Sequence, residues 1–267
     1  MIKVIVNGAY GRMGREVLKA VSSADDMEVV GAIDTQGLGT EIKALIETSS
    51  LDLAIESDLA KKIVETKPDV VIDFTVPQSV YDNIGICLEH KVRPVVGTTG
   101  LKLGVIQEII ARSALLGVGG IIAPNFALGA ILMMEFAAEA AKHFPNVEII
   151  ELHHDQKLDA PSGTAITTAE RIIAQRGDFV QGPFNEMENI IAVRGGKMAG
   201  GVRIHSVRLP GLMANQEVIF GGLGQTLTIR HDTISRESFM PGVLLAVRKV
   251  MPLKEIAYGL DKLLFEK

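Results

Sequence analysis

The stretch from Glu151 to Ala165 concentrates side chains that could do chemistry. It contains two His, one Lys, two Asp and a Ser-Gly-Thr turn. Apolar residues typical of a strand precede it, and apolar residues at helical spacing follow it. The titratable groups are therefore expected where a strand ends and a helix begins, which is where α/β folds place their chemistry.

The Ser-Gly-Thr turn predicts an anion site. Pro161 keeps the preceding residue extended, so the helix begins after it, and Ser162 is a suitable N-cap. The backbone N–H groups of Gly163 and Thr164 then lie in the first helical turn, where they attract anions. Because Lys157 adds a positive charge nearby, we expect a cradle for a carboxylate or a phosphate.

His153 and His154 are adjacent and would point to opposite faces of a regular strand. One is expected to move a proton or orient the substrate, while the other packs or binds the ligand. The alternative is a solvated loop with two exposed His and a capped helix. A metal site is disfavoured, because adjacent His are poorly placed to share one ion, no second ligand pair lies nearby and Lys157 would repel the ion.

The N-terminal segment predicts a dinucleotide site. Residues 2–6 read as a buried strand, Gly8-Ala9-Tyr10-Gly11-Arg12-Met13-Gly14 as a glycine turn, and the following residues as a helix. A second strand, 27–33, ends at Asp34, 20 residues beyond Gly14, near the expected position of an acidic residue for the adenosine ribose. Arg12 either contacts the phosphates or is a solvated charge. Since Asp34 repels a 2′-phosphate, we expect NADH to be used at least as well as NADPH.

Further strands are predicted at 69–75, 92–96 and 118–123, with helices at 78–90, 101–116 and 131–143, and irregular structure at 37–59. This alternation predicts a doubly wound parallel sheet. Phe74 and the turn Gly97-Thr98-Thr99-Gly100 follow two of the strands, so they fall on the edge expected for the cofactor. The turn is equally compatible with a simple strand-to-helix connection.

The second half predicts a mixed, largely antiparallel sheet from strands at 147–154, 202–208, 216–220 and 225–231. Its open face is a candidate oligomer surface. A helix is expected at 164–175 and a polar loop at 176–188, and the glycine-rich segment 194–201 is interpreted as a flexible surface loop rather than a flap. Residues 235–250 and 253–264 are predicted helical, and His205 and His231 receive no role.

Composition excludes several classes of protein. The 267 residues carry a formal net charge of −5 without a basic run, which disfavours nucleic-acid binding. The single cysteine, Cys87, fits a reducing compartment and is expected to be a small buried hydrophobe. The first residues do not resemble a signal peptide, and no apolar run reaches the ~18 residues of a membrane span. We therefore expect a cytoplasmic location.

The pattern Glu-x-His-His-x-x-Lys-x-Asp-Ala-Pro-Ser-Gly-Thr-Ala at 151–165 resembles the signature of the 4-hydroxy-tetrahydrodipicolinate reductase (dihydrodipicolinate reductase) family. The glycine turn, Gly97-Thr98-Thr99-Gly100 and Pro124-Asn125-Phe126 extend the resemblance over the chain. It implies a Rossmann-type doubly wound parallel sheet plus an α+β substrate and oligomerisation domain with a mixed sheet. Residues 1–124, completed by 236–267, would bind the dinucleotide, and residues 125–235 would bind substrate after a short hinge.

The resemblance also implies the reaction, which is NADH- or NADPH-dependent reduction of a cyclic dicarboxylate imine to tetrahydrodipicolinate in diaminopimelate and lysine biosynthesis. It makes His153 the proton donor or acceptor and Lys157 a proton donor, although Lys157 could serve only as a charge clamp. One carboxylate would sit on Gly163 and Thr164, and the other near Lys157 and His154. The expected cofactor contacts are Gly8, Ala9, Tyr10, Gly11, Arg12, Met13, Asp34, Phe74, Gly97, Thr98, Thr99, Ala123, Pro124, Asn125 and Phe126.

A homotetramer is implied by the same resemblance. Two other functions stay open on the residues alone: another NAD-dependent amino-acid dehydrogenase, and a non-catalytic nucleotide-sensing module. A lyase or hydrolase lacks support, because the sequence contains neither a Gly-x-Ser-x-Gly turn nor a cluster of metal ligands.

Overall fold

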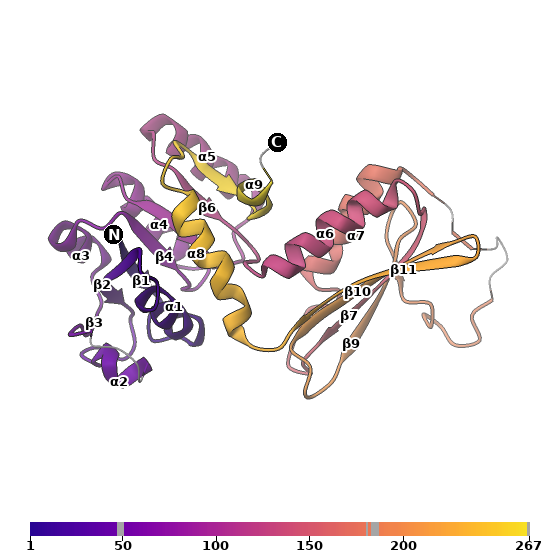
Figure 1. Ribbon diagram of the computed structural model, residues 1–267, viewed down its shortest axis with the longest axis horizontal. Helices are drawn as coiled ribbons and strands as arrows, with labels where there is room; N and C mark the ends of the chain where they lie inside the picture. Colours follow the sequence, from indigo (N-terminus) through magenta and orange to yellow (C-terminus); the bar gives the residue numbers. More distant parts are fainter. Residues whose placement is uncertain (47–50, 180, 183–186, 266–267) are drawn as a thin grey trace. The chain divides into compact units, whose positions relative to one another are not determined.

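The computed structural model describes residues 1–46, 51–179, 181–182 and 187–265. The described chain forms two compact units, residues 1–126 with 239–267 and residues 127–238 (Figure 1). These boundaries differ by two or three residues from the expected 124/125 and 235/236. The C-terminal end of the chain is thus part of the first unit.

The first unit is built on parallel strands joined by helices. Its strands are β1 (Ile2–Asn7), β2 (Met27–Ile33), β3 (Ile55–Glu56), β4 (Val70–Asp73), β5 (Arg93–Val96), β6 (Gly120–Ile122) and β12 (Ile256–Tyr258). Its helices are α1 (Arg12–Ser22), α2 (Ile42–Ile46), α3 (Leu59–Thr66), α4 (Val80–Glu89), α5 (Leu103–Leu116), α8 (Met240–Lys249) and α9 (Asp261–Leu264). The spatial order β12-β6-β5-β4-β1-β2-β3, with parallel pairing throughout, confirms the predicted doubly wound sheet.

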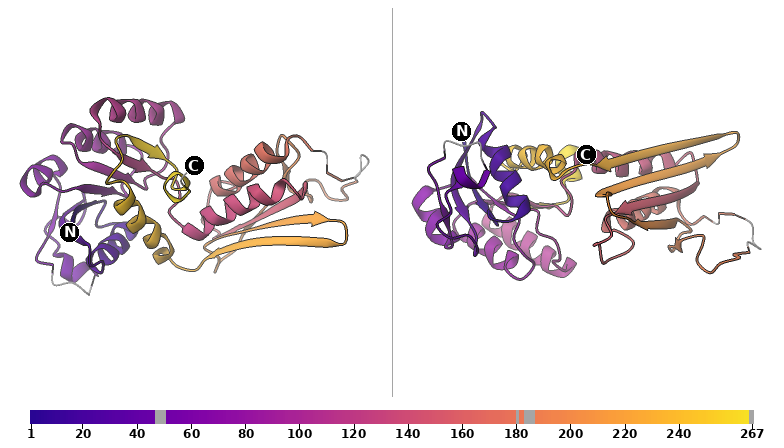
Figure 2. Two further views of the ribbon diagram at one scale, coloured as in Figure 1. Left: turned by 45° about the horizontal axis from the view of Figure 1, so that its top comes forward. Right: turned by 90° about the horizontal axis from the view of Figure 1, so that it is seen from below.

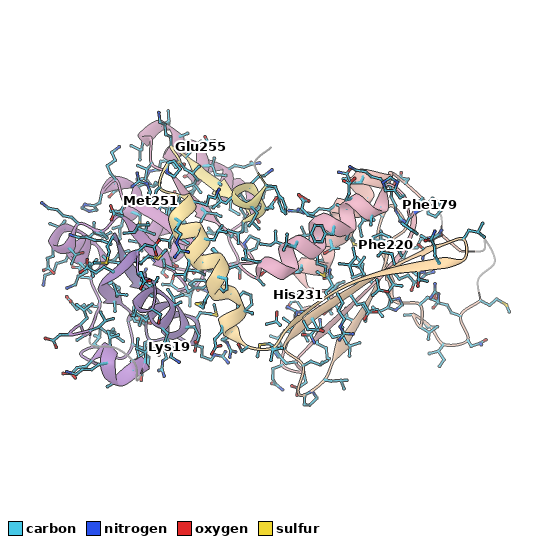
Figure 3. All side chains as sticks on the ribbon, viewed as in Figure 1. Lys19, Phe179, Phe220, His231, Met251 and Glu255 are labelled. Carbon is cyan, nitrogen blue, oxygen red and sulfur yellow. The ribbon has the colours of Figure 1, made fainter. Side chains whose placement is uncertain are left out.

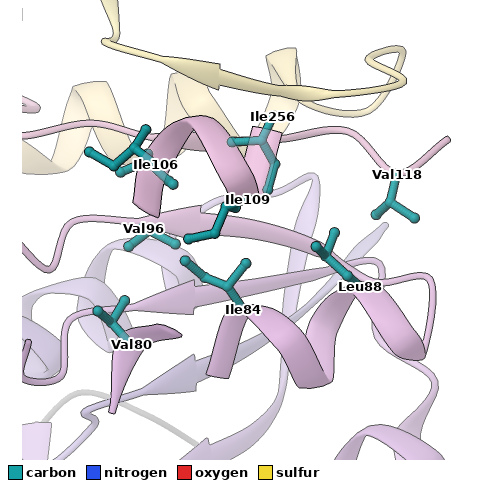
Figure 4. Close-up of a cluster of buried hydrophobic side chains, with 9 residues drawn as sticks. Val80, Ile84, Leu88, Val96, Ile106, Ile109, Val118 and Ile256 are labelled. Carbon is teal, nitrogen blue, oxygen red and sulfur yellow. The ribbon is translucent and has the colours of Figure 1, made fainter. Parts of the chain in front are cut away.

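Continuous apolar runs place these strands at the centre of the unit. Val4, Ile5 and Val6 of β1 are fully buried, as a strand covered on both faces by helices requires. One cluster of the core joins α4, α5 and β12, and Figure 4 shows Ile84, Ile109 and Ile256 facing one another within it. The core therefore fixes the strand ends that carry the glycine turn and Asp73.

The second unit contains one mixed sheet and two long helices. Its elements are α6 (Leu128–Ala141), β7 (Asn146–His153), α7 (Gly163–Arg176), β8 (Gly196–Lys197), β9 (Arg203–Arg208), β10 (Ala214–Gly222) and β11 (Gln225–Thr233). The strand order is β11-β10-β7-β9-β8, with β7 and β9 parallel and the other pairs antiparallel. The hairpin β10–β11 forms a long two-stranded ribbon in both views of Figure 2. This mixed sheet confirms the predicted class of the second unit.

Helices α6 and α7 cover one face of this sheet. Alternate residues of β7, such as Val147 and Ile149, are buried on that face, whereas Glu148 and Ile150 point to the other face and are only half-buried. Phe220 of β10, labelled in Figure 3, is fully buried and its ring centroid lies 6.5 Å from that of Phe144. Because one face is covered and the other is not, the register of β7 decides which side chains reach the helix layer.

The prediction of a helix at 253–264 is wrong. Residues Ile256–Tyr258 form strand β12 beside β6, and only Asp261–Leu264 are helical. Apolar residues recur there at helical spacing, but Gly259 has a φ of +93°, which ends any regular element. Burial of Ile256 against α5 then decides in favour of the strand. The helix expected at 235–250 begins with a 3-10 turn, Arg236–Phe239, before α8.

Two segments expected to be irregular contain short elements. Segment 37–59 includes α2 and β3, with residues 47–50 outside the described residues. In the glycine-rich segment 194–201, interpreted as a flexible loop, Gly196–Lys197 pair with β9 as strand β8. A Cβ at Gly201 would lie 2.1 Å from the Phe179 carbonyl oxygen, so close backbone packing accounts for this glycine. Of the polar loop 176–188, residues 180 and 183–186 lie outside the described residues.

Ser113 provides a test of how β12 docks. Its buried hydroxyl accepts a hydrogen bond from the Ile256 backbone N–H at 2.9 Å and donates one to the Ile110 carbonyl at 2.7 Å. Ser113→Ala leaves that buried N–H without its partner, so we expect the free energy of unfolding in urea to fall by about 1–3 kcal/mol. Ser23→Ala, which removes an exposed hydroxyl bonded to the Lys19 carbonyl, is the matched control. Equal effects of the two variants would contradict the docking described here.

Candidate functional site

The signature stretch lies between β7 and α7, as predicted. Ser162 is the N-cap of α7: its buried side chain accepts a hydrogen bond from the Ala165 N–H at 3.2 Å. Gly163 follows as an exposed residue, and a Cβ added to it would meet nothing within 4 Å. The first turn of this 14-residue helix therefore presents backbone N–H groups and the positive end of the helix dipole next to open space.

A buried carboxylate holds the end of β7. Glu151 is fully buried, and its Oε2 lies 2.5 Å from Nδ1 of His153, two residues further on the same face of the strand. Arg208 of β9 stands opposite His153 in the parallel register and donates to both oxygens of Glu151, at 2.9 Å and 2.7 Å. Oε1 of Glu151 also accepts a hydrogen bond from the Ser162 backbone N–H at 3.3 Å.

The charge of Glu151 follows from these contacts. Burial by itself raises the pKa of Glu151, but the hydrogen bonds from His153, Arg208 and Ser206 outweigh burial and lower it to about 2. The carboxylate is therefore ionised at neutral pH. Because an ionised carboxylate only accepts hydrogen bonds, the facing Nδ1 of His153 carries a hydrogen and donates it.

Lys157 joins the same network through the loop. Its Nζ donates to Oδ1 of Asp159 at 2.7 Å, and this hydrogen bond lowers the pKa of Asp159. The backbone carbonyl of Asp159 accepts from Arg208 at 2.9 Å. His153 and Lys157 are thus connected through Glu151, Arg208 and Asp159, whereas His154 lies just beyond the strand and is exposed.

Neither Glu151 nor Arg208 was predicted to have a role from the sequence. Glu151 belongs to the quoted signature, and its spacing of two residues from His153 on a predicted strand already indicated a shared face. Arg208 had no comparable signal, because its position opposite His153 depends on the pairing of two strands distant in sequence. His205 and His231, which received no role, contact Glu148 and pack near Gly129, respectively.

The three glycines of the turn in the first unit are packed to different degrees. Gly8 has a φ of +83°, and a Cβ there would lie 2.4 Å from the Phe74 carbonyl oxygen. A Cβ at Gly14 would lie 2.0 Å from the Gly8 carbonyl oxygen. Gly11, in contrast, is exposed, has an ordinary φ of −66° and would bring its Cβ near only one atom, at 3.2 Å. Internal packing therefore explains Gly8 and Gly14, whereas the contact that a Cβ at Gly11 would make is less close.

The ends of β1 and β2 surround this turn with polar groups. Gly11 caps α1 without a side-chain hydrogen bond, and the first turn contains no acidic residue. Asp34, at the end of β2, accepts from the backbone N–H groups of Tyr10 and Gln36, both at 2.9 Å. The Arg15 guanidinium lies 4.7 Å from the centroid of the Tyr10 ring. Arg12 and Met13 begin α1, and Arg12 is exposed.

Asp73, a second buried carboxylate, organises the ends of β4 and β5. It accepts from the side-chain amides of Asn7 and Asn83 at 2.9 Å and 2.8 Å, and from the hydroxyls of Thr75 and Thr98, both at 2.7 Å. The Thr75 backbone N–H contributes a further bond at 3.1 Å. All of these donors are neutral. Hydrogen bonds without a cation therefore satisfy the buried Asp73 side chain and join the strand ends around it. The sequence analysis missed this residue as well.

Phe74 closes the same corner of the first unit. A Cβ at Gly97 would lie 2.1 Å from the Phe74 ring, so the ring packs directly on the backbone after β5. The ring centroids of Phe74 and Phe126 are 5.8 Å apart, and Phe126 is buried. Thr99 and Pro124 are exposed and Ala123 is buried. The structure thus brings Phe74, Gly97, Thr98 and Phe126 together at neighbouring strand ends.

These residues fit a nicotinamide dinucleotide. A helix N-terminus without a side-chain cap or an acidic residue suits the pyrophosphate, and its N-cap residue, Gly11, is exposed and has no side chain in the way. Asp34 retains acceptor capacity for ribose hydroxyls, since each oxygen accepts only one of the backbone hydrogen bonds.

The described residues carry neither a membrane span nor a cluster of metal ligands. None of the described helices is both long enough and apolar enough to cross a membrane. Among the same residues, no three His, Cys, Asp or Glu side chains gather as ligands of a metal ion would.

Comparison with known proteins assigns the chain to a family. Models of the dihydrodipicolinate reductase N-terminus and C-terminus match residues 2–126 and 129–264. The 4-hydroxy-tetrahydrodipicolinate reductase of Listeria innocua is 52% identical over 263 residues, covering 98% of this chain and all of that protein. The protein of the same name from Desulfitobacterium hafniense is 54% identical over 264 residues, covering 98% of each chain.

Solved structures agree with this assignment. Dihydrodipicolinate reductase from Paenisporosarcina sp. TG-14, a structure with dipicolinate bound, superposes with a TM-score of 0.87 at 45% identity and covers 98% of this chain and 99% of its own. An amine dehydrogenase from Mycobacterium smegmatis reaches a TM-score of 0.68 at 15% identity over 96% of this chain and 94% of its own, which shows a shared fold alone. The chain therefore belongs to the dihydrodipicolinate reductase family, oxidoreductases that use NADH or NADPH to reduce 4-hydroxy-tetrahydrodipicolinate in diaminopimelate and lysine biosynthesis.

Proposed function

We propose that the second unit holds the dicarboxylate substrate on the turn between β7 and α7. One carboxylate accepts hydrogen bonds from the backbone at Gly163 and Thr164, and the other lies near Lys157 and His154. The observation that carries this proposal is the exposed N-terminal turn of α7 beside a lysine held by Asp159. A planar dianion is the chemistry that such a site favours, and dipicolinate in the related Paenisporosarcina structure is a molecule of this kind.

His153 and Lys157 are proposed to handle protons. NADH or NADPH supplies the hydride, whose addition leaves negative charge on the substrate, so a proton must follow. His153 donates or accepts that proton through Nε2, because its Nδ1 faces Glu151. Lys157 either donates the proton that follows the hydride or clamps a substrate carboxylate by its charge.

The coenzyme is proposed to bind the first unit along the strand ends. Its pyrophosphate would lie over the glycine turn at the start of α1, its adenosine ribose at Asp34, and its nicotinamide near Phe74 and Thr98. The full set of proposed contacts is Gly8, Ala9, Tyr10, Gly11, Arg12, Met13, Asp34, Phe74, Gly97, Thr98, Thr99, Ala123, Pro124, Asn125 and Phe126. Asp34 favours NADH, because its charge repels the 2′-phosphate of NADPH.

The open face of the second sheet is proposed to assemble the chain into a cytoplasmic homotetramer. Ile150, Leu152 and Ile219 lie on the face opposite α6 and α7, where they are half-buried in the single chain. A sheet face that carries apolar side chains without a covering layer is suited to pair with another copy.

The proton-handling residues are tested by His153→Ala and Lys157→Gln. We expect each to lower kcat by about 10²–10⁴-fold, the usual contribution of a positioned acid or base, while the Kd for NADH stays unchanged. Turnover is followed as NADH oxidation, with dihydrodipicolinate synthase generating the unstable substrate in the same cuvette. Exposed neighbours at the end of α6 supply matched controls, His143→Ala and Lys142→Gln. Near-normal kcat in His153→Ala or Lys157→Gln would remove that residue from the mechanism.

Coenzyme preference is tested at Thr35, an exposed residue beside Asp34. Thr35→Arg places a cation near the expected 2′-phosphate, so the ratio of kcat/KM for NADPH to that for NADH should rise about two- to fivefold, as an exposed ion pair of ~0.5–1 kcal/mol allows. Ser23→Arg adds the same charge at the far end of α1 and should leave the ratio unchanged. An unchanged ratio in Thr35→Arg would count against ribose binding at Asp34.

Assembly is tested with Ile150→Asp. A carboxylate on the proposed contact face must be desolvated when copies pair, so this variant is expected to sediment as a smaller species than the wild-type protein. Leu115→Asp, which changes an exposed apolar residue of α5 in the first unit, is the control and should keep the wild-type mass. If Ile150→Asp sediments like the wild type, the open face is not the contact surface.

A further inference from the structure

Three of the residues that hydrogen-bond to Glu151 belong to the candidate site. Its Oε2 contacts His153 and Arg208, while its Oε1 contacts Arg208 and the backbone N–H of Ser162. Glu151 is fully buried, and His153 is only 14% exposed. One carboxylate therefore determines both where the His153 ring lies and where the N-terminus of α7 begins.

The charged groups around His153 come from three elements. Glu151 lies on β7 itself, Arg208 lies opposite on β9, and Asp159 with its partner Lys157 lies on the loop before α7. On the other side, β10 places the apolar Ala214 opposite His153. Among the described residues, Glu151 is the only one whose carboxylate contacts the His153 ring directly.

We propose that Glu151 and Arg208 are positioning residues for the reduction: Glu151 fixes the Nδ1–H tautomer of His153 and stabilises its imidazolium form, and Arg208 keeps Glu151 ionised and ties it to the substrate-binding turn. This inference rests on the proposed role of His153. It adds a third group that orients the acid–base residue, an arrangement that makes the other ring nitrogen available to the substrate.

Arg208 and Glu151 act on the protonated ring in opposite directions. The negative charge of Glu151 favours imidazolium, whereas the positive charge of Arg208 competes for the same carboxylate. Removing one charge is therefore expected to move the pH profile of the reaction one way, and removing the other is expected to move it the opposite way. A merely structural role of the pair gives no such change of sign.

The same strand offers a matched control on its other face. Glu148 also contacts one arginine and one histidine, with Arg194 Nη2 at 2.5 Å and His205 Nε2 at 2.8 Å. It is half-buried and points away from the helices. Glu148→Gln therefore removes the same charge from the same kind of contact, without touching His153.

The experiment is the pH profile of kcat with NADH and enzymatically generated substrate. In the wild type, the alkaline limb reports loss of the proton from the group that must be protonated. We expect Glu151→Gln to move this limb to lower pH by about one unit or more and Arg208→Gln to move it to higher pH, as loss of an adjacent charge requires. Glu148→Gln, once shown to have the wild-type mass, should leave the alkaline limb of the profile at its wild-type pH. Glu151→Asp keeps the carboxylate, so it should bring the alkaline limb most of the way back to its wild-type pH.

A second measurement is independent of turnover. Nitrogen-15 spectra of the histidine rings, with the His153 signals identified by their loss in His153→Gln, should show one Nδ1–H tautomer in the wild type and a mixture in Glu151→Gln. If Arg208→Gln does not fold, Arg208→Lys replaces it; this variant keeps a charge but cannot span both Glu151 oxygens and the Asp159 carbonyl. It should raise the KM for substrate with the limb unmoved.

The outcomes separate this inference from the proposed function. If His153→Ala and His153→Gln keep kcat, the role of His153 fails, whatever Glu151 does. The positioning role is overturned if the His153 variants lose kcat but Glu151→Gln keeps both the wild-type pH of the alkaline limb and the wild-type tautomer of His153. Limbs that move in the same direction in Glu151→Gln and Arg208→Gln would also overturn it.

Discussion

The cost of removing a carboxylate from water governs the second unit. Glu151 has no exposure to solvent, and an ion buried in this way is tolerated only when a counter-charge and hydrogen bonds replace its hydration. The partners of Glu151 are Arg208 on the adjacent strand β9, His153 on β7 and the N-cap residue of α7, Ser162. Satisfying one charge therefore assembles three separate segments of chain around one point.

The first unit obeys the same constraint with different chemistry. Asp73 is also buried at a strand end, but amides, hydroxyls and one backbone N–H satisfy it without a cation. Its donors come from β1, α4 and the turn after β5, so the segments that form the proposed nicotinamide corner share one acceptor. In both units, loops that carry little apolar surface are ordered by a buried carboxylate, because packing alone could not fix them.

These constraints also explain what the sequence could predict. Strands such as β1 and β4 are continuous apolar runs, and the glycine turn and the capped helix α7 are local patterns, so all of them could be recognised from neighbouring residues. Strand β12 was mistaken for a helix, because its three residues bury Ile256 at a spacing that suits either element and only contact with α5 and β6 decides between them. Arg208 meets Glu151 across 57 residues, and Asn7 meets Asp73 across 66, distances over which a single sequence carries no pairing information.

Folding requirements divide the residues of the signature into two groups. Burial and hydrogen bonding account for Glu151 and Ser162, and for Arg208 outside the signature, since each satisfies a group that would otherwise be unpaired in the interior. No comparable requirement explains a lysine whose contact is the largely exposed Asp159, or a glycine at position 163, where an added Cβ would meet nothing within 4 Å. A residue type that the fold does not demand marks a candidate position for ligand contact, and Gly163 is such a position at the N-terminus of α7, where backbone N–H groups attract anions.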